Sequence, residues 1–260
     1  MAALFKSIKP LPQFSKKAVP NALHEALRLL FTGSWTDVCL VGGTALAGVY
    51  AEHRRSDDID LFATTPSSFT AMVRQTAGLK KQGAVFSQEL STPHYFHAAV
   101  DFKKHRFTLD IVLDENLKNL GEPFVTEEGI PVARLETLFC MKVACLVSRC
   151  SEKDLFDLDW IFSKIGFVDV ATLIECGRKI DAGVTAESML ISLNGTLLKK
   201  EACHFALPET GVTVEEAHKR VSKLQKKLIH DFGEFEKKEK PLSEIQSLKD
   251  MASIQKKISK

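Results

Sequence analysis

The chain has 260 residues, of which 45% are hydrophobic and 26% charged, and 35 Lys and Arg residues against 33 Asp and Glu give a formal net charge of +2. This composition is typical of soluble globular proteins and excludes a disordered chain, a fibre and a coiled-coil rod, while the near-neutral charge excludes a general electrostatic attraction to nucleic acid or membrane. Residues 38–51 form the longest uncharged stretch of the N-terminal half, and they are fewer than the roughly 20 apolar residues that a membrane helix needs. The sequence also shows no secretory signal and no C-x-x-C pair. We therefore expect a cytoplasmic protein with no membrane partner.

Apolar periodicity predicts alternating helices and strands in the first half of the chain. Residues 1–20 are rich in Pro and Lys and predict an irregular arm. Apolar residues spaced three and four apart then predict helices, whereas short apolar or alternating runs predict strands. The predicted helices are residues 21–31, 44–52 and 69–79, and the predicted strands are residues 37–41, 57–62, 94–102 and 106–114.

The second half of the chain is predicted to be helical. Residues 133–165 indicate two helices, and helical patterns continue to the end with breaks near residues 194–195 and 208–211. The layout predicts an α/β (α+β) fold, in which a mixed sheet flanked by helices is followed by a helical domain. The predicted divisions are an N-terminal arm of residues 1–20, a catalytic domain of residues 21–125 and a helical C-terminal domain of residues 126–260.

Paired glycines follow the first predicted strand. Gly42 and Gly43 end the strand, and Thr44 is expected to open a helix. Glycines allow another group to approach the backbone closely, and a helix N-terminus offers free N–H groups to an anion such as a triphosphate. The alternative is a plain tight turn, so the glycines alone leave both interpretations open.

Two carboxylates follow on the next predicted strand. Side chains alternate along a strand, so Asp58 and Asp60 share one face while Ile59 packs inward. A divalent cation relieves the repulsion between two such carboxylates, and Mg²⁺ commonly takes one or two carboxylates plus substrate phosphates. The alternatives are an exposed acidic strand end, or an acid paired with Arg54 or Arg55.

A third carboxylate lies in the last predicted strand. Asp110 is a charge in the middle of an otherwise apolar strand, and such residues are rarely buried without a partner. If this strand pairs with residues 57–62, the three acids form a site for two metal ions, as polymerases use for in-line displacement.

A lone lysine interrupts an apolar helix in the second half. Lys142 is the only polar residue between Leu138 and Val147, so it needs a carboxylate or an anion as a partner. We interpret it as a cation that reaches substrate phosphates, with a lysine that extends its charge to solvent as the alternative. As an isolated buried charge, its removal is expected to leave stability unchanged or raised. Arg149 lies two turns further on the same face, and Asp154 and Asp157 follow on the next helix, where Asp154 is alternatively the partner of Ser151 in a helix cap.

Two motifs in this order resemble the AbiEii/AbiGii-type branch of the nucleotidyltransferase superfamily, bacterial toxins of abortive-infection and toxin–antitoxin systems. The first family motif is a hydrophobic strand, a Gly pair, Thr-Ala-Leu and then Arg-x-Ser-x-Asp-Ile-Asp-Leu. The second is a helix with Lys and then Arg, followed by Lys-Asp-x-x-Asp-Leu. The first is matched by Gly42, Gly43, Thr44, Ala45, Leu46, Arg54, Ser56, Asp58, Ile59, Asp60 and Leu61, and the second by Lys142, Arg149, Lys153, Asp154, Asp157 and Leu158.

This resemblance implies a nucleotidyltransferase fold and an enzyme that moves a nucleotide from an NTP to an acceptor hydroxyl with Mg²⁺ (or Mn²⁺). The acceptor implied is RNA, with the 3′ end of tRNA as one example, and the role implied is that of a toxin or phage-defence protein with an antitoxin partner. The rival functions are a small-molecule nucleotidyltransferase of the antibiotic-modifying type and a nucleotide-binding protein without turnover.

The expected site combines both motifs. The metal ligands expected are Asp58, Asp60 and Asp110, and the last of these also activates the attacking hydroxyl. Catalysis is assigned to these three acids together with Lys142 and Asp154. Nucleotide binding is assigned to Gly42, Gly43, Thr44, Ser56, Lys142, Arg149 and Asp157.

Overall fold

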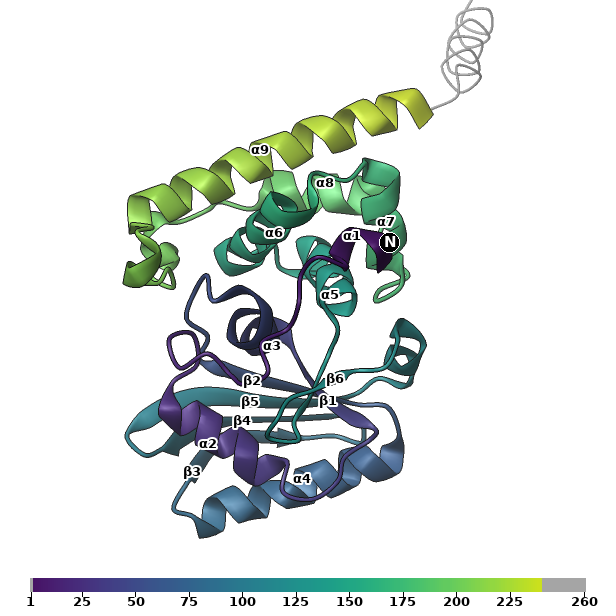
Figure 1. The fold of residues 1–260 in the computed structure, drawn as a ribbon. Coiled ribbons are helices and arrows are strands. Elements are labelled where there is room, and N and C mark those ends of the chain that lie inside the picture. The colour runs from purple at the N-terminus through teal and green to yellow at the C-terminus, as the bar shows by residue number, and fades with distance from the viewer. Residues whose placement is uncertain (1, 240–260) are drawn as a thin grey trace, which may run out of the picture.

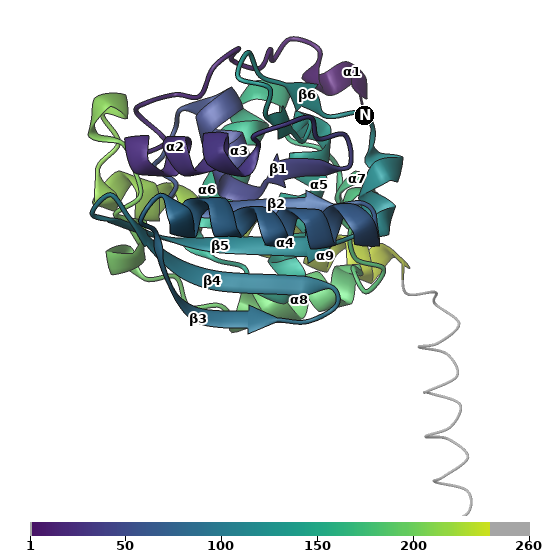
Figure 2. The ribbon, with the colours of Figure 1, turned by 90° about the horizontal axis from the view of Figure 1, so that it is seen from below.

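The computed structural model describes residues 2–239, and these fold around one seven-stranded mixed sheet. The strands follow one another across the sheet in the order β3-β4-β5-β2-β1-β7-β6 (Figures 1 and 2). The strands are β1 (Val38–Val41), β2 (Asp58–Ala63), β3 (Val85–Ser91), β4 (Tyr95–Phe102), β5 (His105–Leu113), β6 (Phe124–Val125) and β7 (Pro131–Val132).

The centre of the sheet is formed by β1, β2 and β5. β1 runs antiparallel to β2, and β2 runs parallel to β5. In this register Asp60 lies opposite Val41 on one side and Asp110 on the other. The pairing of the two acidic strands, on which the predicted three-carboxylate site depends, is therefore confirmed.

Helices cover both faces of the sheet. α2 (Asn21–Leu30) and α4 (Pro66–Lys81) lie below it in Figure 1, as the view from below also shows (Figure 2). On the upper face, α3 (Gly42–Ala45) continues without a break into the π-helical turn η1 (Leu46–Ala51). This helix begins at Gly42 rather than at the expected Thr44, so both glycines belong to its first turn.

The N-terminal segment is packed against the body of the protein, which differs from the expected irregular arm. Its first residues form the short helix α1 (Ala2–Phe5), which packs on α5, and Phe14, Ala18 and Val19 are buried. The carbonyl oxygen of Ala18 accepts a hydrogen bond from the backbone N–H of Ser56. The segment is ordered despite its Pro and Lys content, because its apolar residues are buried in the space beside η1.

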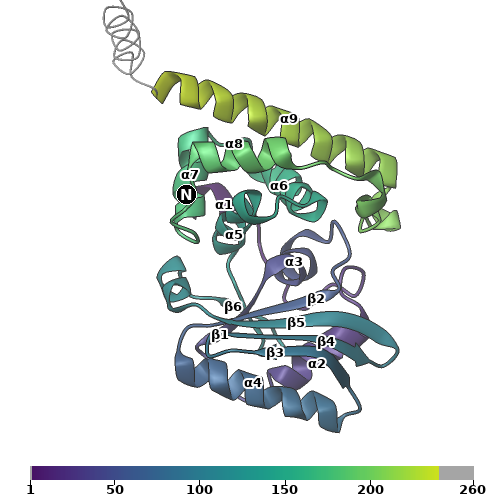
Figure 3. The same ribbon diagram turned by 180° about the vertical axis from the view of Figure 1, so that it is seen from behind.

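The second half of the chain forms a helical layer above the sheet (Figures 1 and 3). Its two predicted helices over residues 133–165 are confirmed as α5 and α6, and the long last helix packs on α6 and α8. The elements are α5 (Leu135–Ser148), α6 (Glu152–Ile165), α7 (Val170–Arg178), α8 (Ala186–Gly195), η3 (Lys200–Cys203), η4 (Pro208–Thr210) and α9 (Val214–Glu239).

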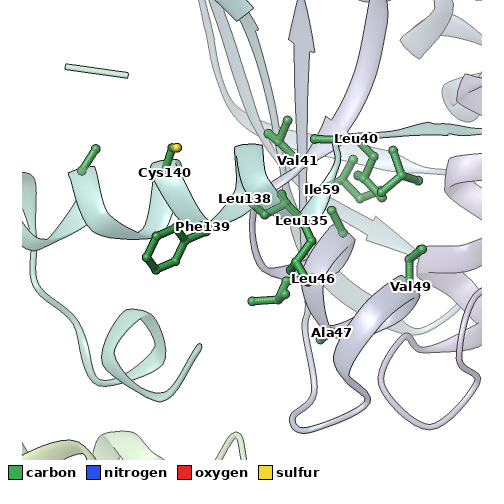
Figure 4. Packing of buried hydrophobic residues seen from close by; sticks show 14 of the residues in the cluster. Leu40, Val41, Leu46, Ala47, Val49, Ile59, Leu135, Leu138, Phe139 and Cys140 are labelled. Carbon is green, nitrogen blue, oxygen red and sulfur yellow. The ribbon is translucent and has the colours of Figure 1, made fainter. Parts of the chain in front are cut away.

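Buried apolar side chains connect the sheet to this layer. Leu40 and Ile59 come from the sheet, Leu46 from the helical turn above it, and Leu135 and Leu138 from α5 (Figure 4). Their continuous packing fixes α5 over the end of β1. The positions of α5 and α6 relative to the acidic strands are thereby set by the core.

Strand β3 and the short pair β6 and β7 carry weak sequence patterns and were not predicted. Seven residues of β3 form one margin of the sheet, and most of them are exposed, so no alternation marks the strand. The turn η2 (Glu115–Leu120) connects β5 to the two-residue strand β6. Among the described helices, none combines the length and apolar character needed to cross a membrane.

Candidate active site

A cavity of about 290 Å³ lies between strands β2 and β5 on one side and helices α5 and α6 on the other. Both predicted motifs contribute to its wall. The cavity is lined by Gly43, Arg54, Asp58, Asp60, Thr108, Asp110, Lys142, Arg149, Ser151, Lys153 and Asp154. The tertiary structure thus brings together residues that are far apart in the sequence.

Three carboxylates face this cavity from neighbouring strands. Asp60 and Asp110 lie directly opposite each other on β2 and β5, and Asp58 lies one step along the same face. Thr108 donates a hydrogen bond of 2.9 Å to Asp58 Oδ1, which holds that carboxylate on the cavity side. The other carboxylate oxygen of Asp58, Oδ2, is 3.8 Å from Lys153 Nζ.

Asp60 has an unusual electrostatic environment. Burial, together with the charges of Asp58 and Asp110, raises its pKa to about 6 even though Lys142 and Arg149 act in the opposite direction. Within residues 2–239, the structure shows no hydrogen bond or ion pair to the Asp60 carboxylate, so neither Arg54 nor Arg55 pairs with it. A half-buried carboxylate without a described partner in a group of acids is well suited to bind a cation.

The glycine pair makes room for the polar side chains of the site. Gly42 has a φ of +69°, and a Cβ atom there would lie 2.0 Å from Asp60 Oδ2. A Cβ atom on Gly43 would lie 2.3 Å from Arg54 Nη2. Both glycines are therefore required by close approach of protein side chains, and Gly43 alone of the two also lines the cavity.

Thr44 and Ser56 are buried behind the cavity wall and do not line it, in contrast to the expected contact with a triphosphate. The Thr44 hydroxyl donates to the carbonyl oxygen of Asp58 and lies 2.9 Å from the Ser56 hydroxyl. Both side chains are almost fully shielded from solvent. They hold the start of β2 against α3, which positions Asp58 and Asp60.

A chain of buried ion pairs joins the two halves of the protein. Arg54 binds Asp157 through two hydrogen bonds of 2.6 and 2.9 Å, and Lys142 lies 2.7 Å from the same carboxylate. Lys142 also lies 2.8 Å from Asp154, which in turn binds Arg149. Each buried charge thus has at least one partner of opposite sign, which is the condition under which ions are tolerated in a protein interior.

The partners of Lys142 correct the expected role of this residue. The side chain is 4% exposed and is held by two carboxylates, so it neither extends to solvent nor is an isolated charge. Burial lowers the pKa of Lys142, but Asp157 and Asp154 outweigh that effect and raise it above its usual value. Lys142 is therefore a buried ammonium group whose charge is already balanced by protein carboxylates.

Asp154 and Asp157 occupy positions that differ from the expected catalytic and nucleotide-binding roles. Burial alone would raise the pKa of each carboxyl, but the neighbouring cations hold both well below the usual range. Asp154 accepts from Lys142, Arg149 and Ser151, and Asp157 from Arg54, Lys142 and His53. With their oxygens occupied, the two acids anchor the neighbouring cations. The alternative that Ser151 and Asp154 form a helix cap is confirmed, since the Ser151 side chain accepts from the Asp154 backbone N–H.

Two cations face the cavity with more freedom. Arg149 is 61% exposed while its guanidinium group binds Asp154, and Lys153 is 44% exposed. Lys153 was matched only as part of the second motif and was not among the predicted site residues. Lys153 lies in the first turn of α6, one helical turn before Asp157. This spacing in the sequence was the signal that could have placed it near the site.

Tyr95 and His97 on β4 extend the site beyond the predicted residues. The Tyr95 hydroxyl and His97 Nδ1 both bind Asp110 Oδ1, the latter at 2.9 Å. The structure shows no partner for Asp110 Oδ2 among the described residues, so this oxygen is available to a substrate. The sequence gave no signal that His97 lies opposite Asp110.

The donor set fits a magnesium ion that is completed by substrate. No group of three or more His, Cys, Asp or Glu side chains within residues 2–239 is arranged to hold a metal ion by itself. Asp58 and Asp60 supply two carboxylates, and Mg²⁺ is commonly held by one or two carboxylates together with substrate phosphates. Oxygen donors without histidine or thiolate also match the preference of Mg²⁺ and Mn²⁺.

Comparison with known proteins identifies the family. A family model described as "Nucleotidyl transferase AbiEii toxin, Type IV TA system" matches residues 28–253. Because this match spans most of the sequence, the chain belongs to the AbiEii nucleotidyltransferase toxin family, as its two motifs predicted. It is a nucleotidyltransferase, and the expected fold class is confirmed.

Two individual proteins are similar to this chain. The uncharacterized protein aq_aa25 of Aquifex aeolicus (strain VF5) is 27% identical over 181 residues, which cover 67% of this chain and 82% of the relative. Among solved structures, MenT4, a nucleotidyltransferase toxin from Mycobacterium tuberculosis H37Rv, has a TM-score of 0.50 and 15% identity over 80% of this chain and 85% of its own. At that identity the likeness to MenT4 concerns the fold alone.

Replacing Lys142 by Met is expected to destabilise the protein by about 3–5 kcal/mol, because it leaves two buried carboxylates short of a counter-ion. This reverses the expectation from the sequence. Denaturant unfolding followed by circular dichroism measures the change. Lys153→Met is the matched control, and as a half-exposed side chain it should alter stability by less than about 0.5 kcal/mol. Equal unfolding midpoints for Lys142→Met and the parent would contradict a stabilising role of the ion-pair chain.

Replacing Asp60 by Asn is expected to raise the melting temperature of the metal-free protein above pH 6. A raised carboxyl pKa means that the folded state keeps its proton between the usual value of 3.8 and about 6, so ionisation at higher pH opposes folding, and Asn avoids this cost. The gain should shrink as the pH falls through 6 and vanish below 3.8, where Asp60 is neutral in both the folded and the unfolded state. Thermal melts across this range test the window, with the exposed Asp101→Asn as control. A gain that is constant with pH would show that the Asp60 charge is not its cause.

Proposed function

We propose that this nucleotidyltransferase moves a nucleotide from an NTP to a hydroxyl group of an RNA acceptor in a Mg²⁺-dependent (or Mn²⁺-dependent) reaction. The observation that carries the proposal is the arrangement of Asp58, Asp60 and Asp110 on one face of two paired strands, opposite the cations Arg149 and Lys153 in one cavity. Carboxylates suit metal binding, and cations across from them suit a triphosphate. As a member of a type IV toxin family, the protein is proposed to act as a toxin or in phage defence, with an antitoxin as its partner.

The metal is proposed to bind to Asp58 and Asp60. When bound, Mg²⁺ supplies positive charge that stabilises the phosphoryl oxygens and the leaving group. Asp60 is the stronger of the two anchors, because it has no described partner to give up. Thr108 keeps Asp58 turned toward the same cavity, so the two carboxylates are held in place before any ligand arrives.

The triphosphate is proposed to lie against Arg149, Lys153 and the backbone at Gly43. Arg149 is oriented by Asp154, and Lys153 has only a 3.8 Å contact with Asp58, so both retain donors for phosphate oxygens. Lys142 also lines the cavity and is proposed to act indirectly, because it holds the Asp154 that orients Arg149. Phosphoryl transfer depends mostly on such positioning and charge stabilisation.

The proposed reaction is an in-line displacement. The acceptor hydroxyl oxygen forms a bond to the α-phosphorus of the NTP, the bond from that phosphorus to the bridging oxygen of the β-phosphate breaks, and diphosphate leaves. Asp110 Oδ2 takes the hydroxyl proton, since Oδ1 is occupied by Tyr95 and His97. Asp110 is assigned as the base rather than as a principal metal ligand for the same reason.

The deciding experiment incubates the protein with each α-labelled NTP, Mg²⁺ and total RNA, followed by electrophoresis. We expect label in RNA with the parent protein, none after addition of EDTA, and none with Asp110→Asn. Label in a small molecule would support the antibiotic-modifying type of activity instead. NTP binding without any product would support a nucleotide-binding protein without turnover. Either result overturns the proposed RNA acceptor.

Lys153→Met is expected to raise the KM for NTP at least about tenfold, because it removes a charged hydrogen bond to phosphate, with little effect on stability. Initial rates at saturating RNA measure the change. Lys164→Met, which changes a lysine at the far end of the same helix, is the control. An unchanged KM would remove Lys153 from the nucleotide site.

A further inference from the structure

We propose that the sheet face beside Asp110, formed by β3 and β4, binds the 3′-terminal base of the acceptor RNA, with the rings of Tyr95 and His97 as the stacking surface. The inference rests on the proposed function, because it assigns the acceptor site of that reaction. The same two side chains would also position Asp110 for the attacking hydroxyl.

The two rings are placed where the acceptor must arrive. His97 lies directly opposite Asp110 across the β4–β5 pair, and Tyr95 lies two residues earlier on the same face. The two rings are stacked on each other, with centroids 6.3 Å apart and planes inclined by 21°. A substrate that approaches Asp110 Oδ2 from the β4 side therefore meets this aromatic pair.

Exposed apolar side chains lie on the neighbouring strand β3. Leu90, opposite His97, is 52% exposed, and Val85, opposite Asp101 at the start of that strand, is 63% exposed. The helices α2 and α4 pack against the other face of the sheet, and β3 lies at its margin (Figure 2). Exposed apolar side chains on a sheet, next to two aromatic rings, form a platform of the kind on which RNA-binding sheets stack bases.

The charges of this surface favour a base over a phosphate as the bound group. Asp58, Asp60 and Asp110 repel the phosphate backbone, while the aromatic pair of Tyr95 and His97 offers an uncharged partner for stacking with any base. A 3′-terminal nucleotide carries both a base and the attacking hydroxyl. Stacking of that base on Tyr95 and His97 would leave its ribose beside Asp110 Oδ2.

Tyr95 and His97 also hydrogen-bond to Asp110 Oδ1, so they would position this carboxylate in addition to stacking with the base. Tyr95 contributes a ring to stacking and a hydroxyl to the Asp110 carboxylate. Loss of the ring should raise the KM for RNA, whereas loss of the hydroxyl alone should lower kcat. Comparison of Tyr95→Leu with Tyr95→Phe separates the two effects, since Phe retains the ring.

The test uses an RNA oligonucleotide with the 3′ end that the parent protein labels in total RNA. It is prepared once with an intact terminal nucleotide and once with an abasic terminal nucleotide that keeps both ribose hydroxyls. For the parent we expect the abasic RNA to raise the acceptor KM by about tenfold or more, the loss typical of one stacked base. For Tyr95→Leu we expect the intact RNA to show this loss already and the abasic RNA to add little to it.

Two further measurements distinguish stacking from a merely structural role. The KM for NTP and the melting temperature of Tyr95→Leu should remain close to those of the parent, and Tyr95→Phe should keep the parent's RNA KM with a reduced kcat. Val125→Ser, which changes an exposed apolar residue at the opposite margin of the sheet, is the control and should change neither constant.

Equal use of intact and abasic RNA by the parent would overturn the base-binding site while leaving the proposed function intact. Full addition of the two losses in Tyr95→Leu would also overturn it, because interacting groups must give a non-additive result. If the parent labels no RNA at all, the proposed function fails, and this inference fails with it.

Discussion

The fold depends on the chain of ion pairs Arg54–Asp157–Lys142–Asp154–Arg149, which is buried except at its Arg149 end. Arg54 comes from the loop before β2, Lys142 from the middle of α5, and the two acids from the first two turns of α6. Buried ions are costly unless each is paired with good geometry, so these three segments have to meet in one arrangement. The apolar contacts of Leu40, Leu46 and Leu138 provide the surrounding core, but many apolar side chains could pack there equally well. The ion pairs supply the register between the two layers.

The same constraint divides the carboxylates of the site into two classes. Asp154 and Asp157 have cations on every side and a lowered pKa, so they remain charged anchors. Asp60 has a raised pKa and no described partner, so a bound cation would stabilise its ionised carboxylate. Residues of identical chemistry thus take opposite roles because their environments differ. The chain of ion pairs contains three cations and two acids, so it keeps a net positive charge. This charge lies across the cavity from Asp58, Asp60 and Asp110.

The two substrates of the proposed reaction would meet different kinds of surface. The nucleotide side lies between the layers, where Arg149 and Lys153 are presented by the helical half. The acceptor side lies on the sheet alone, where β4 places Tyr95 and His97 beside Asp110. The nucleotide side depends on the ion-pair chain for its geometry, whereas the acceptor side depends on strand register. Changes in the exposed residues of β3, or in Tyr95 and His97 on β4, would therefore alter the acceptor side without disturbing the nucleotide side.

The sequence by itself determined the family, the main helices and central strands, and the acidic strand face. These features are local, because alternation along β2 places Asp58 and Asp60 together whatever the rest of the chain does. Only the tertiary structure decided that Lys142 is neutralised by Asp154 and Asp157, that Thr44 and Ser56 lie behind the cavity wall, and that Tyr95 and His97 hold Asp110. Each of these depends on contacts between distant segments, such as the register of β4 on β5 or the docking of α5 on the sheet. Periodicity shows which face a side chain is on, but the partner on that face is set by how the layers pack.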